Sequence, residues 1–197
     1  MNKIKKDKKE YRIAFLEGKK VILRPLLKKD INERYLSWLN DKKVTKYMET
    51  GVFPTTLAEL HSFYDKVAKS RTDVMFAIVA KHNKLHIGNI KLGCINWVHR
   101  FADLGIMIGD KRYWSKGFGQ EACRLLLEYA FSRLSLNKVF LGVYATHSFA
   151  LRAYKKIGFK VEGRMRKMFN IDNRYVDKII MGALREDFLR NYKKQIR

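Results

Sequence analysis

The sequence predicts an α/β (α+β) fold: one domain with a central mixed, mostly antiparallel sheet of about six or seven strands, flanked by helices. Short apolar runs recur along the chain, and several alternate apolar with polar residues, as half-buried strands do. Residues 122–130 instead place apolar side chains at helical spacing. At 197 residues, of which 47% are hydrophobic, the chain can bury a substantial core. We expect residues 13–197 to form this domain, after a basic tail over residues 1–12.

The first third of the chain predicts one strand followed by helices. Val21–Leu26 is an apolar run that predicts the first strand, with its proline near the end. Asp30 is a candidate N-cap for the helix that follows this strand. Thr56 and Glu59 have the spacing of a capping box, which predicts a helix over Leu57–Lys69.

The rest of the chain predicts the remainder of the sheet and its covering helices. Val74–Lys81 and Leu85–Ile95 predict a hairpin across a polar turn. The later elements are a strand over Phe101–Gly109, a helix after Gly117, a parallel-type strand over Lys138–Tyr144, a helix over Ser148–Ile157 ended by Gly158, an antiparallel pair over Phe159–Asn170 and Arg174–Leu184, and a basic helix over Arg185–Lys194.

The predicted strand Phe101–Gly109 has two unlike faces. Alternate residues are apolar on one face (Ala102, Leu104, Ile106, Ile108) and carry little side-chain bulk on the other (Asp103, Gly105, Met107, Gly109). A sheet face that is lined by glycine leaves room for a ligand, or for a closely packed helix. The pattern alone leaves both open.

A glycine loop follows this strand and leads into a helix. The stretch from Tyr113 to Ala122 places Gly117 and Gly119 just before the periodic helix pattern. Glycines let the backbone approach a ligand closely, and the first N–H groups of a helix attract anions, most often phosphates. The spacing matches neither a P-loop nor a dinucleotide-binding fingerprint. By itself, the motif indicates either a phosphate site or a tight turn without a ligand.

Three blocks in chain order resemble the GNAT N-acetyltransferase superfamily. Trp114–Gly119 is similar to its acetyl-CoA pyrophosphate loop, although a tryptophan stands where Gln or Arg is usual. His147–Phe159 resembles a second family block. Glu162–Met181 resembles the ending of the RimJ/RimL-like (ribosomal-protein N-acetyltransferase-like) branch. Together, the blocks give a resemblance that covers roughly residues 20–187.

The resemblance implies acetyl-CoA as the cosubstrate and a sheet that splays beside it. The pantetheine arm would lie along the strand 101–109, and a backbone N–H near Ile108 or Gly109 would stabilise the oxyanion. His147 stands where the family usually has an asparagine that bonds this arm, and its imidazole could replace the asparagine or simply begin the helix. The implied cofactor-binding residues are Ile108, Gly109, Trp114, Ser115, Lys116, Gly117, Phe118, Gly119, Gln120 and His147.

Acetyl transfer to an amine needs an acid and a base. The acceptor ammonium, with a pKa of about 10, must lose a proton, and the departing CoA thiolate must gain one. The resemblance points to Tyr154 as the acid, although its helix face also fits a core tyrosine. Asp103 resembles the general base of some GNAT enzymes, acting directly or through water, and an exposed strand aspartate fits it as well. His99 and Glu162 are weaker candidates for the base.

The chain is strongly basic, with a formal net charge of +23 and a pI near 10.1. This charge suits an anionic partner, such as CoA, a nucleotide-linked substrate or an RNA-associated protein. A lysine-rich surface without a specific role explains it equally well. The charge argues against polycationic acceptors such as polyamines, which it would repel.

Short motifs bear on location and metal content. No apolar run is long enough to cross a bilayer, and the basic N-terminus lacks the apolar segment of a signal peptide. Cys94 and Cys123 are expected to be buried as small apolar residues in a reducing cytoplasm. His82 and His86 are four residues apart, but we expect them on a turn and a strand, where their side chains do not share a face as they would on a helix. We therefore expect no metal site.

We therefore expect an acetyl-CoA-dependent N-acetyltransferase that acts on a primary amine. The expected acceptor is a nucleotide-linked amino sugar or a protein N-terminal amine. The alternatives are a polyamine or antibiotic N-acetyltransferase, and a non-catalytic CoA-binding or RNA-associated module of the same fold. The expected partner is a small-molecule or protein amine, with no membrane and no direct nucleic-acid contact; a homodimer is left open.

Overall fold

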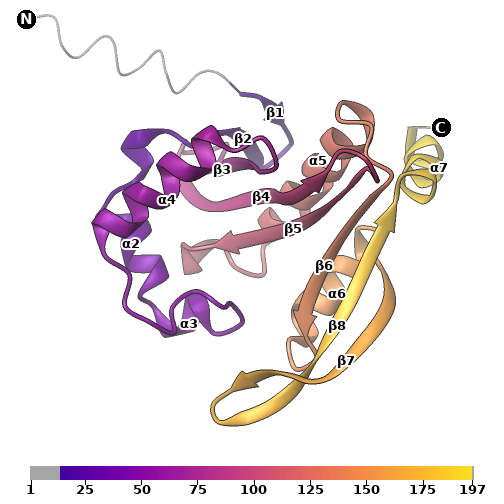
Figure 1. Cartoon of the computed structure of the whole chain (residues 1–197). Helices are drawn as coiled ribbons and strands as arrows, with labels where there is room; N and C mark the ends of the chain where they lie inside the picture. The colour runs from indigo at the N-terminus through magenta and orange to yellow at the C-terminus, as the bar shows by residue number, and fades with distance from the viewer. Residues whose placement is uncertain (1–13, 197) are drawn as a thin grey trace, which may run out of the picture.

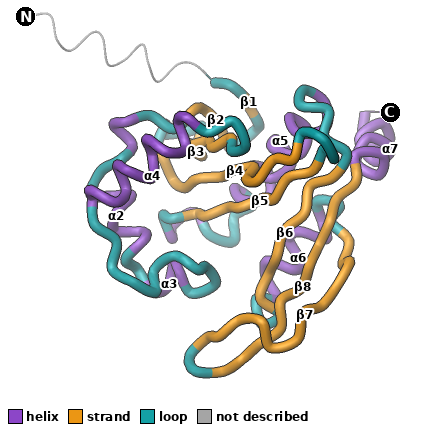
Figure 2. Tube along the Cα trace, in the orientation of Figure 1, coloured by secondary structure: helices purple, strands orange, loops and turns teal. Residues whose placement is uncertain are grey.

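An eight-stranded sheet forms the centre of the molecule, with helices on both of its faces (Figure 1; Figure 2). The computed structural model describes residues 14–196, so the predicted basic tail over residues 1–12 lies outside the described residues. In sheet order, the strands are β1 (Leu16–Glu17), β2 (Val21–Pro25), β3 (Val74–Ala80), β4 (His86–Asn96), β5 (Phe101–Ile108), β6 (Lys138–Tyr144), β8 (Arg174–Leu184) and β7 (Lys160–Ile171). The helices are η1 (Lys28–Asp30), α2 (Glu33–Leu39), α3 (Lys42–Thr45), α4 (Leu57–Lys69), η2 (Lys111–Tyr113), α5 (Phe118–Ser132), α6 (Ser148–Lys156) and α7 (Arg185–Ile196).

The sheet opens between β5 and β6. These two strands run parallel and share only three residue pairs, the last of them Asp103 opposite Phe140. Beyond this point they diverge, while β4 stays paired with β5 as far as Ile108 and β8 stays paired with β6 as far as Tyr144. Figure 1 shows the two parts of the sheet leaning apart here. The gap between β5 and β6 confirms the splayed sheet that the resemblance implies.

Two hydrophobic cores lie on opposite faces of the sheet. The alternation along β2 shows this directly, because Leu23 packs into one core and its neighbour Ile22 into the other. The larger core is covered by α5 and α6 and includes the fully buried Leu126 of α5. The smaller core is covered by α2 and α4, where Trp38 and Leu60 are buried. Each face of the sheet is therefore covered by packed helices.

Several local predictions are confirmed at the level of single residues. The capping box of α4 is present, with Glu59 N–H donating to Thr56 Oγ1 at 3.2 Å and Thr56 N–H donating to the Glu59 carboxylate at 2.8 Å. Gly158 follows α6 with a φ of +105°, as expected of the residue that ends a helix. Asp172 and Asn173 both have positive φ in the turn that joins β7 to β8. One strand, the two-residue β1, has no counterpart in the prediction.

Two local predictions are wrong. Asp30 is not the N-cap of α2, which is Asn32: the buried Asp30 carboxylate binds the guanidinium of Arg24 at 2.6 and 2.8 Å and accepts the Leu27 N–H at the start of η1, at 2.8 Å. A buried arginine needs such a partner, so the carboxylate of Asp30 pairs with Arg24, six residues earlier, and does not cap α2. Cys94 is exposed, because the register of β4 shifts there and Cys94 has a φ of +50°. Cys123 is buried as expected, and its burial raises the pKa of the thiol to about 12.

Candidate active site

The edge of β5 presents backbone groups to the gap. Gly109 N–H donates to the Ile87 C=O at 2.9 Å, so it is committed to β4. Successive residues of an antiparallel strand point their polar backbone groups in opposite directions, which directs the N–H and C=O of Ile108 toward the gap. The Ile108 C=O accepts a hydrogen bond from Trp114 Nε1–H at 2.7 Å. Of the two predicted oxyanion donors, only the Ile108 N–H therefore faces the gap.

The other face of β5 is partly filled by protein. A Cβ at Gly109 would overlap the ring of Trp38, so this glycine allows α2 to pack closely on the strand. A Cβ at Gly105 would contact only the flexible side chain of Lys91, at 3.3 Å or more. Beside Gly105 and Met107 the face borders an open pocket. A helix therefore packs on this face at Gly109, and open space remains beside Gly105 and Met107, where a bound ligand stays a prediction.

The predicted pyrophosphate loop has the backbone shape of an anion site. Ser115 and Gly117 have φ values of 59° and 84°, and Gly117 is the N-cap of α5, with no side chain to satisfy the first N–H groups. A Cβ at Gly119 would meet only ordinary contacts, the nearest at 3.6 Å to Ile108. Gln120 follows in the first helical turn. The N–H groups at the positive end of this 15-residue helix are therefore available to a phosphate, and the loop fits the pyrophosphate of CoA.

The side chains of this loop differ in their surroundings. Trp114, Ser115 and Lys116 are exposed. Phe118 is buried, with its ring edge-on to that of Tyr113 at 5.0 Å between centroids. Of the predicted cofactor-binding residues, Phe118 can thus offer only its backbone to a ligand, while its ring anchors the loop to the core.

Tyr154, the predicted acid, lies on α6 at the edge of the larger core. Its ring contacts that of Phe159, with centroids 5.7 Å apart. Burial raises the pKa of its hydroxyl, and the nearby Cys123 and Asp103 raise it further. A tyrosine in these surroundings keeps its proton at neutral pH, as a general acid must before it donates. The two predicted catalytic residues lie within electrostatic range of each other.

Asp103, the predicted base, lies where β5 and β6 part. It is the last residue of β5 that pairs with β6. Burial raises the pKa of its carboxyl, while the ammonium groups of Lys91 and Lys178 oppose the shift and the carboxylate of Glu49 adds to it. A carboxylate with a raised pKa is a stronger base. The position and the pKa of Asp103 both suit proton removal at the narrow end of the gap.

The remaining candidates have other contacts. Glu162 forms an ion pair with Lys138 at 2.6 Å, and His99 is exposed in the turn before β5. The ring of His147 stacks on that of Tyr47, with centroids 4.0 Å apart, and burial lowers the pKa of the imidazole. His147 precedes the first residue of α6 but makes no capping hydrogen bond with its side chain. It joins α6 to the α3 region, and a contact with the pantetheine arm stays a prediction.

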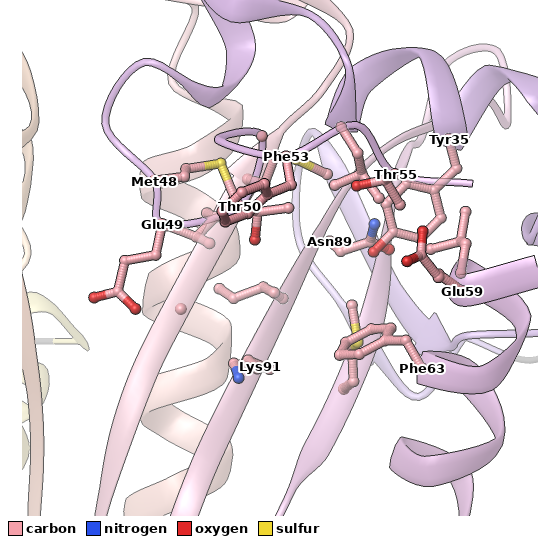
Figure 3. A pocket seen from close by; sticks show the side chains of 18 of the residues that line it. Tyr35, Met48, Glu49, Thr50, Phe53, Thr55, Glu59, Phe63, Asn89 and Lys91 are labelled. Carbon is pink, nitrogen blue, oxygen red and sulfur yellow. The ribbon is translucent and has the colours of Figure 1, made fainter. Parts of the chain in front are cut away.

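A pocket of about 480 Å³ opens on the bare face of β5 (Figure 3). Its walls come from α2, residues 48–55, α4 and the middle of β4 and β5, and they are mostly apolar. The charged side chains that line it are Glu49, Glu59 and Lys91. In Figure 3, Glu49 and Lys91 lie toward the left and Glu59 toward the right. The pocket therefore combines mostly apolar walls with a few charged side chains.

A chain of buried polar side chains reaches this pocket. Asp30, held by Arg24, lies 3.9 Å from His86 Nδ1, and His86 Nε2 lies 2.9 Å from Asn89 Oδ1. Burial lowers the pKa of the His86 imidazole, so the ring is neutral at pH 7. Asn89 Nδ2 is buried and has no hydrogen-bond partner among the described residues. Asn89 and Glu49 are not predicted from the sequence, since no motif marks them; Arg24, a charge inside an apolar strand, is the one signal of the buried network in the sequence.

Comparison with known proteins identifies the family. A model of the Acetyltransferase (GNAT) domain family matches residues 20–160 of the chain. The chain belongs to the GNAT acetyltransferase family. It is an acetyltransferase that uses acetyl-CoA as its cosubstrate and transfers the acetyl group to an amine. Within residues 14–196, no helix is long and apolar enough to span a membrane, and no cluster of three His, Cys, Asp or Glu side chains is arranged to bind a metal ion.

Among GNAT proteins, the chain is similar to spermidine acetyltransferases. The spermidine N(1)-acetyltransferase of Escherichia coli (strain K12) is 32% identical over 174 residues, which cover 88% of this chain and 90% of that protein. The spermidine N(1)-acetyltransferase of Vibrio cholerae is 31% identical over 131 residues, covering 66% and 75% of the two chains. A crystal structure of the Vibrio cholerae enzyme in complex with CoA and spermine superimposes with a TM-score of 0.80 at 28% identity, covering 87% of this chain and 99% of that chain.

Proposed function

We propose that this GNAT acetyltransferase acetylates a primary amine of a small aliphatic polyamine. The observation that carries the proposal is the likeness to spermidine N-acetyltransferases, which extends over 88% of the chain in the Escherichia coli relative. The pocket beside β5 supports it, because apolar walls suit methylene chains and carboxylates suit ammonium groups.

Glu49 is the pocket carboxylate with the most capacity for an ammonium group. Glu59 already accepts hydrogen bonds from the N–H and the hydroxyl of Thr56, both at 2.8 Å. Glu49 lines the same pocket and acts electrostatically on Asp103. In this proposal, Glu49 pairs with one ammonium group of the polyamine, while the amine that reacts lies near Asp103.

Three groups carry the chemistry in this proposal. Asp103 takes a proton from the acceptor ammonium, directly or through water, so that the amine can attack the thioester carbonyl of acetyl-CoA. The Ile108 N–H, directed into the gap, donates a hydrogen bond to the oxyanion that forms. Tyr154 returns a proton to the departing thiolate. These roles rest on the relative positions of the three groups around the gap.

The net charge of +23 has less influence on the binding of the acceptor than the magnitude of this charge implies. Exposed charges are screened beyond about 10 Å at 0.1 M salt, so a bound acceptor responds mainly to nearby groups. The pocket is lined by Glu49 and Glu59 against Lys91, with Asp103 close by. The local balance is thus acidic even though the chain is basic, and it allows a polyamine to bind.

A nucleotide-linked amino sugar is the second candidate acceptor. Among residues 14–196, Asn89 Nδ2 is a buried donor at the pocket without a hydrogen-bond partner, and a sugar hydroxyl oxygen would accept its hydrogen bond. A protonated polyamine has no such acceptor atom. Lys91 adds a cation that suits the phosphates of a nucleotide-linked substrate. These two side chains favour the amino sugar, whereas the relatives and Glu49 favour the polyamine.

The finer assignments of the sequence analysis stay predictions. They include membership of the RimJ/RimL-like branch, the protein N-terminal amine or antibiotic as acceptor, and a non-catalytic CoA-binding module. The cytoplasmic location, the homodimer and the domain boundaries at residues 12 and 13 are likewise predictions.

Thiol release from acetyl-CoA with separate acceptor pools tests the proposed function. The pools are spermidine with spermine, nucleotide-linked amino sugars, peptides with free N-termini, and aminoglycosides. We expect turnover with the polyamine pool. Turnover with the amino sugars alone would replace the polyamine by the second candidate. No turnover from any pool, with CoA binding intact by thermal shift, would contradict both.

A further inference from the structure

A turn between β1 and β2 is bound to the first turn of α5. The carboxylate of Glu121 accepts hydrogen bonds from the backbone N–H groups of Lys19, Lys20 and Val21, at 2.7, 2.8 and 3.1 Å. The contact is close, because a Cβ at Gly18 would overlap this carboxylate. One carboxylate on α5 therefore fixes the backbone of a segment about 100 residues earlier in the chain.

The fixed turn holds the Lys20 ammonium at the N-terminus of α5. Lys20 Nζ donates to the C=O of Lys116 at 2.9 Å and lies 3.6 Å from where a Cβ of Gly117 would be. It also lies 5.9 Å from the centroid of the Phe118 ring. Among the described residues, no carboxylate forms an ion pair with it. Lys20 thus lies directly beside the glycine of the pyrophosphate loop.

The Lys20 ammonium adds positive charge at the N-terminus of α5, which already carries a partial positive charge. The N-terminus of α5 has the equivalent of about half a positive charge, and Lys116 is adjacent. The carboxylate of Glu121, in the first turn of α5, offsets one positive charge, and the helix end with the ammonium groups of Lys20 and Lys116 still leaves a positive balance around Gly117. A cation at this end of a helix is unfavourable by itself and becomes favourable once an anion lies between the cation and the N–H groups. The charges around Gly117 therefore indicate that the Lys20 ammonium serves a bound phosphate.

We propose that Lys20 is a ligand of the CoA pyrophosphate and that Glu121 is the residue that positions it. The Lys20 ammonium and the loop N–H groups would both donate hydrogen bonds to oxygens of the pyrophosphate. Lys20 lies 96 residues before Lys116, so the loop motif does not mark it. The proposal concerns CoA binding alone and holds for any acceptor amine.

Isothermal titration calorimetry on Lys20→Gln tests the proposal with three probes. CoA contains the pyrophosphate and a 3′-phosphate, dephospho-CoA contains only the pyrophosphate, and pantetheine contains neither. We expect the Kd values for CoA and dephospho-CoA to rise by the same factor, about tenfold, and the Kd for pantetheine to stay unchanged. Lys19→Gln on the same turn is the matched control and should leave all three values unchanged. Lys20→Arg should restore most of the affinity for CoA.

Two results would overturn the role of Lys20: an unchanged Kd for CoA, or a rise for CoA without one for dephospho-CoA, which would assign the contact to the 3′-phosphate. The role of Glu121 is tested by Glu121→Gln, which places an NH₂ group against the backbone donors. We expect it to weaken CoA binding and to leave Lys20→Gln with little further effect in the double variant. Fully additive losses would overturn the positioning role. Thermal unfolding without ligand checks that each variant is folded.

Discussion

The cofactor side and the acceptor side of this protein are built differently. On the predicted cofactor side, the candidate binding groups are mostly backbone groups, at Ile108 on the edge of β5 and at Gly117 before α5. On the acceptor side, they are side chains, with Glu49 from the loop after α3, Glu59 from α4 and Asn89 from β4. The first set follows from the local fold of one continuous segment. The second is assembled from a loop, a helix and a strand that the fold brings together around one pocket.

This difference explains why the family is easier to assign than the acceptor. Backbone groups keep their positions when most side chains change, so a GNAT enzyme at 32% identity can bind the same cosubstrate. A few side-chain changes in the pocket are enough to change the preferred amine. The two sides should therefore respond separately to substitution, and four substitutions test this, from the largest expected effect to the smallest.

Tyr154→Phe should slow the acetyl-transfer step and leave the binding of CoA and of the acceptor amine intact. We expect kcat to fall by about 100-fold or more, because general acid catalysis typically contributes that much. The Kd for CoA and the KM for the acceptor should change little. Steady-state thiol release and calorimetry measure these values. A kcat within twofold of the unmodified enzyme would make Tyr154 a core residue only.

Asp103→Asn should lower kcat/KM by about tenfold or more at pH 7. The base must be ionised, so the activity of the unmodified enzyme should fall as the pH drops through the raised pKa of Asp103. The variant should lack this acidic limb. A pH–rate profile with the same shape in both enzymes would contradict the assignment.

The same substitution should stabilise the fold at neutral pH. Burial raises the folded-state pKa of Asp103 above its unfolded value, so this group's favourable contribution is complete below the unfolded pKa and is lost as the pH rises through the folded pKa. We expect Asp103→Asn to raise the Tm at pH 7, with the gain disappearing near pH 3, where both states are protonated. A Tm difference that is independent of pH would contradict the raised pKa.

Gly119→Ala should weaken CoA binding by about five- to tenfold, since the added methyl group crowds a phosphate at the helix N-terminus. The fold should tolerate it, because the nearest atom to the new Cβ is 3.6 Å away. Gly163→Ala in β7 is the matched control, with only Ile180 within 4 Å, at 3.9 Å. Calorimetry with CoA distinguishes the two variants. Equal affinities would argue for a tight turn without a ligand.

Glu49→Gln should have the smallest effect and act on the acceptor side alone. We expect the KM for spermidine to rise about threefold, as for the loss of a partly exposed ion pair, with the Kd for CoA unchanged. Glu33→Gln, an exposed position on α2, is the control. An unchanged KM would remove Glu49 from the proposed acceptor site.

The sequence predicts the cofactor side better than the acceptor side, for a physical reason. The strand over residues 101–108, the left-handed Gly117 and the helix after it depend on local periodicity and backbone freedom, which a single sequence displays. Asp30 has the local pattern of a cap, but a buried arginine on another element takes its carboxylate. Asn89 and Glu49 belong to no local pattern, since the fold alone brings them to one pocket.

The short join between β5 and β6 has a mechanical consequence. Because β5 and β6 share three residue pairs, the sheet consists of two parts that are joined only along this short pairing. Asp103 lies at the end of the pairing. A rotation of one part relative to the other about this pairing moves the atoms near the pairing least. A change in the angle between the two parts would therefore leave the carboxylate of Asp103 almost in place. Ile108 and Tyr144, at the far ends of their strands, would move most. Away from this strand pairing, the stack of Tyr47 on His147, the ring contact of Tyr47 with Tyr144 and the ion pair of Lys46 with Asp172 also join the two parts, so these contacts together limit how far the parts can separate.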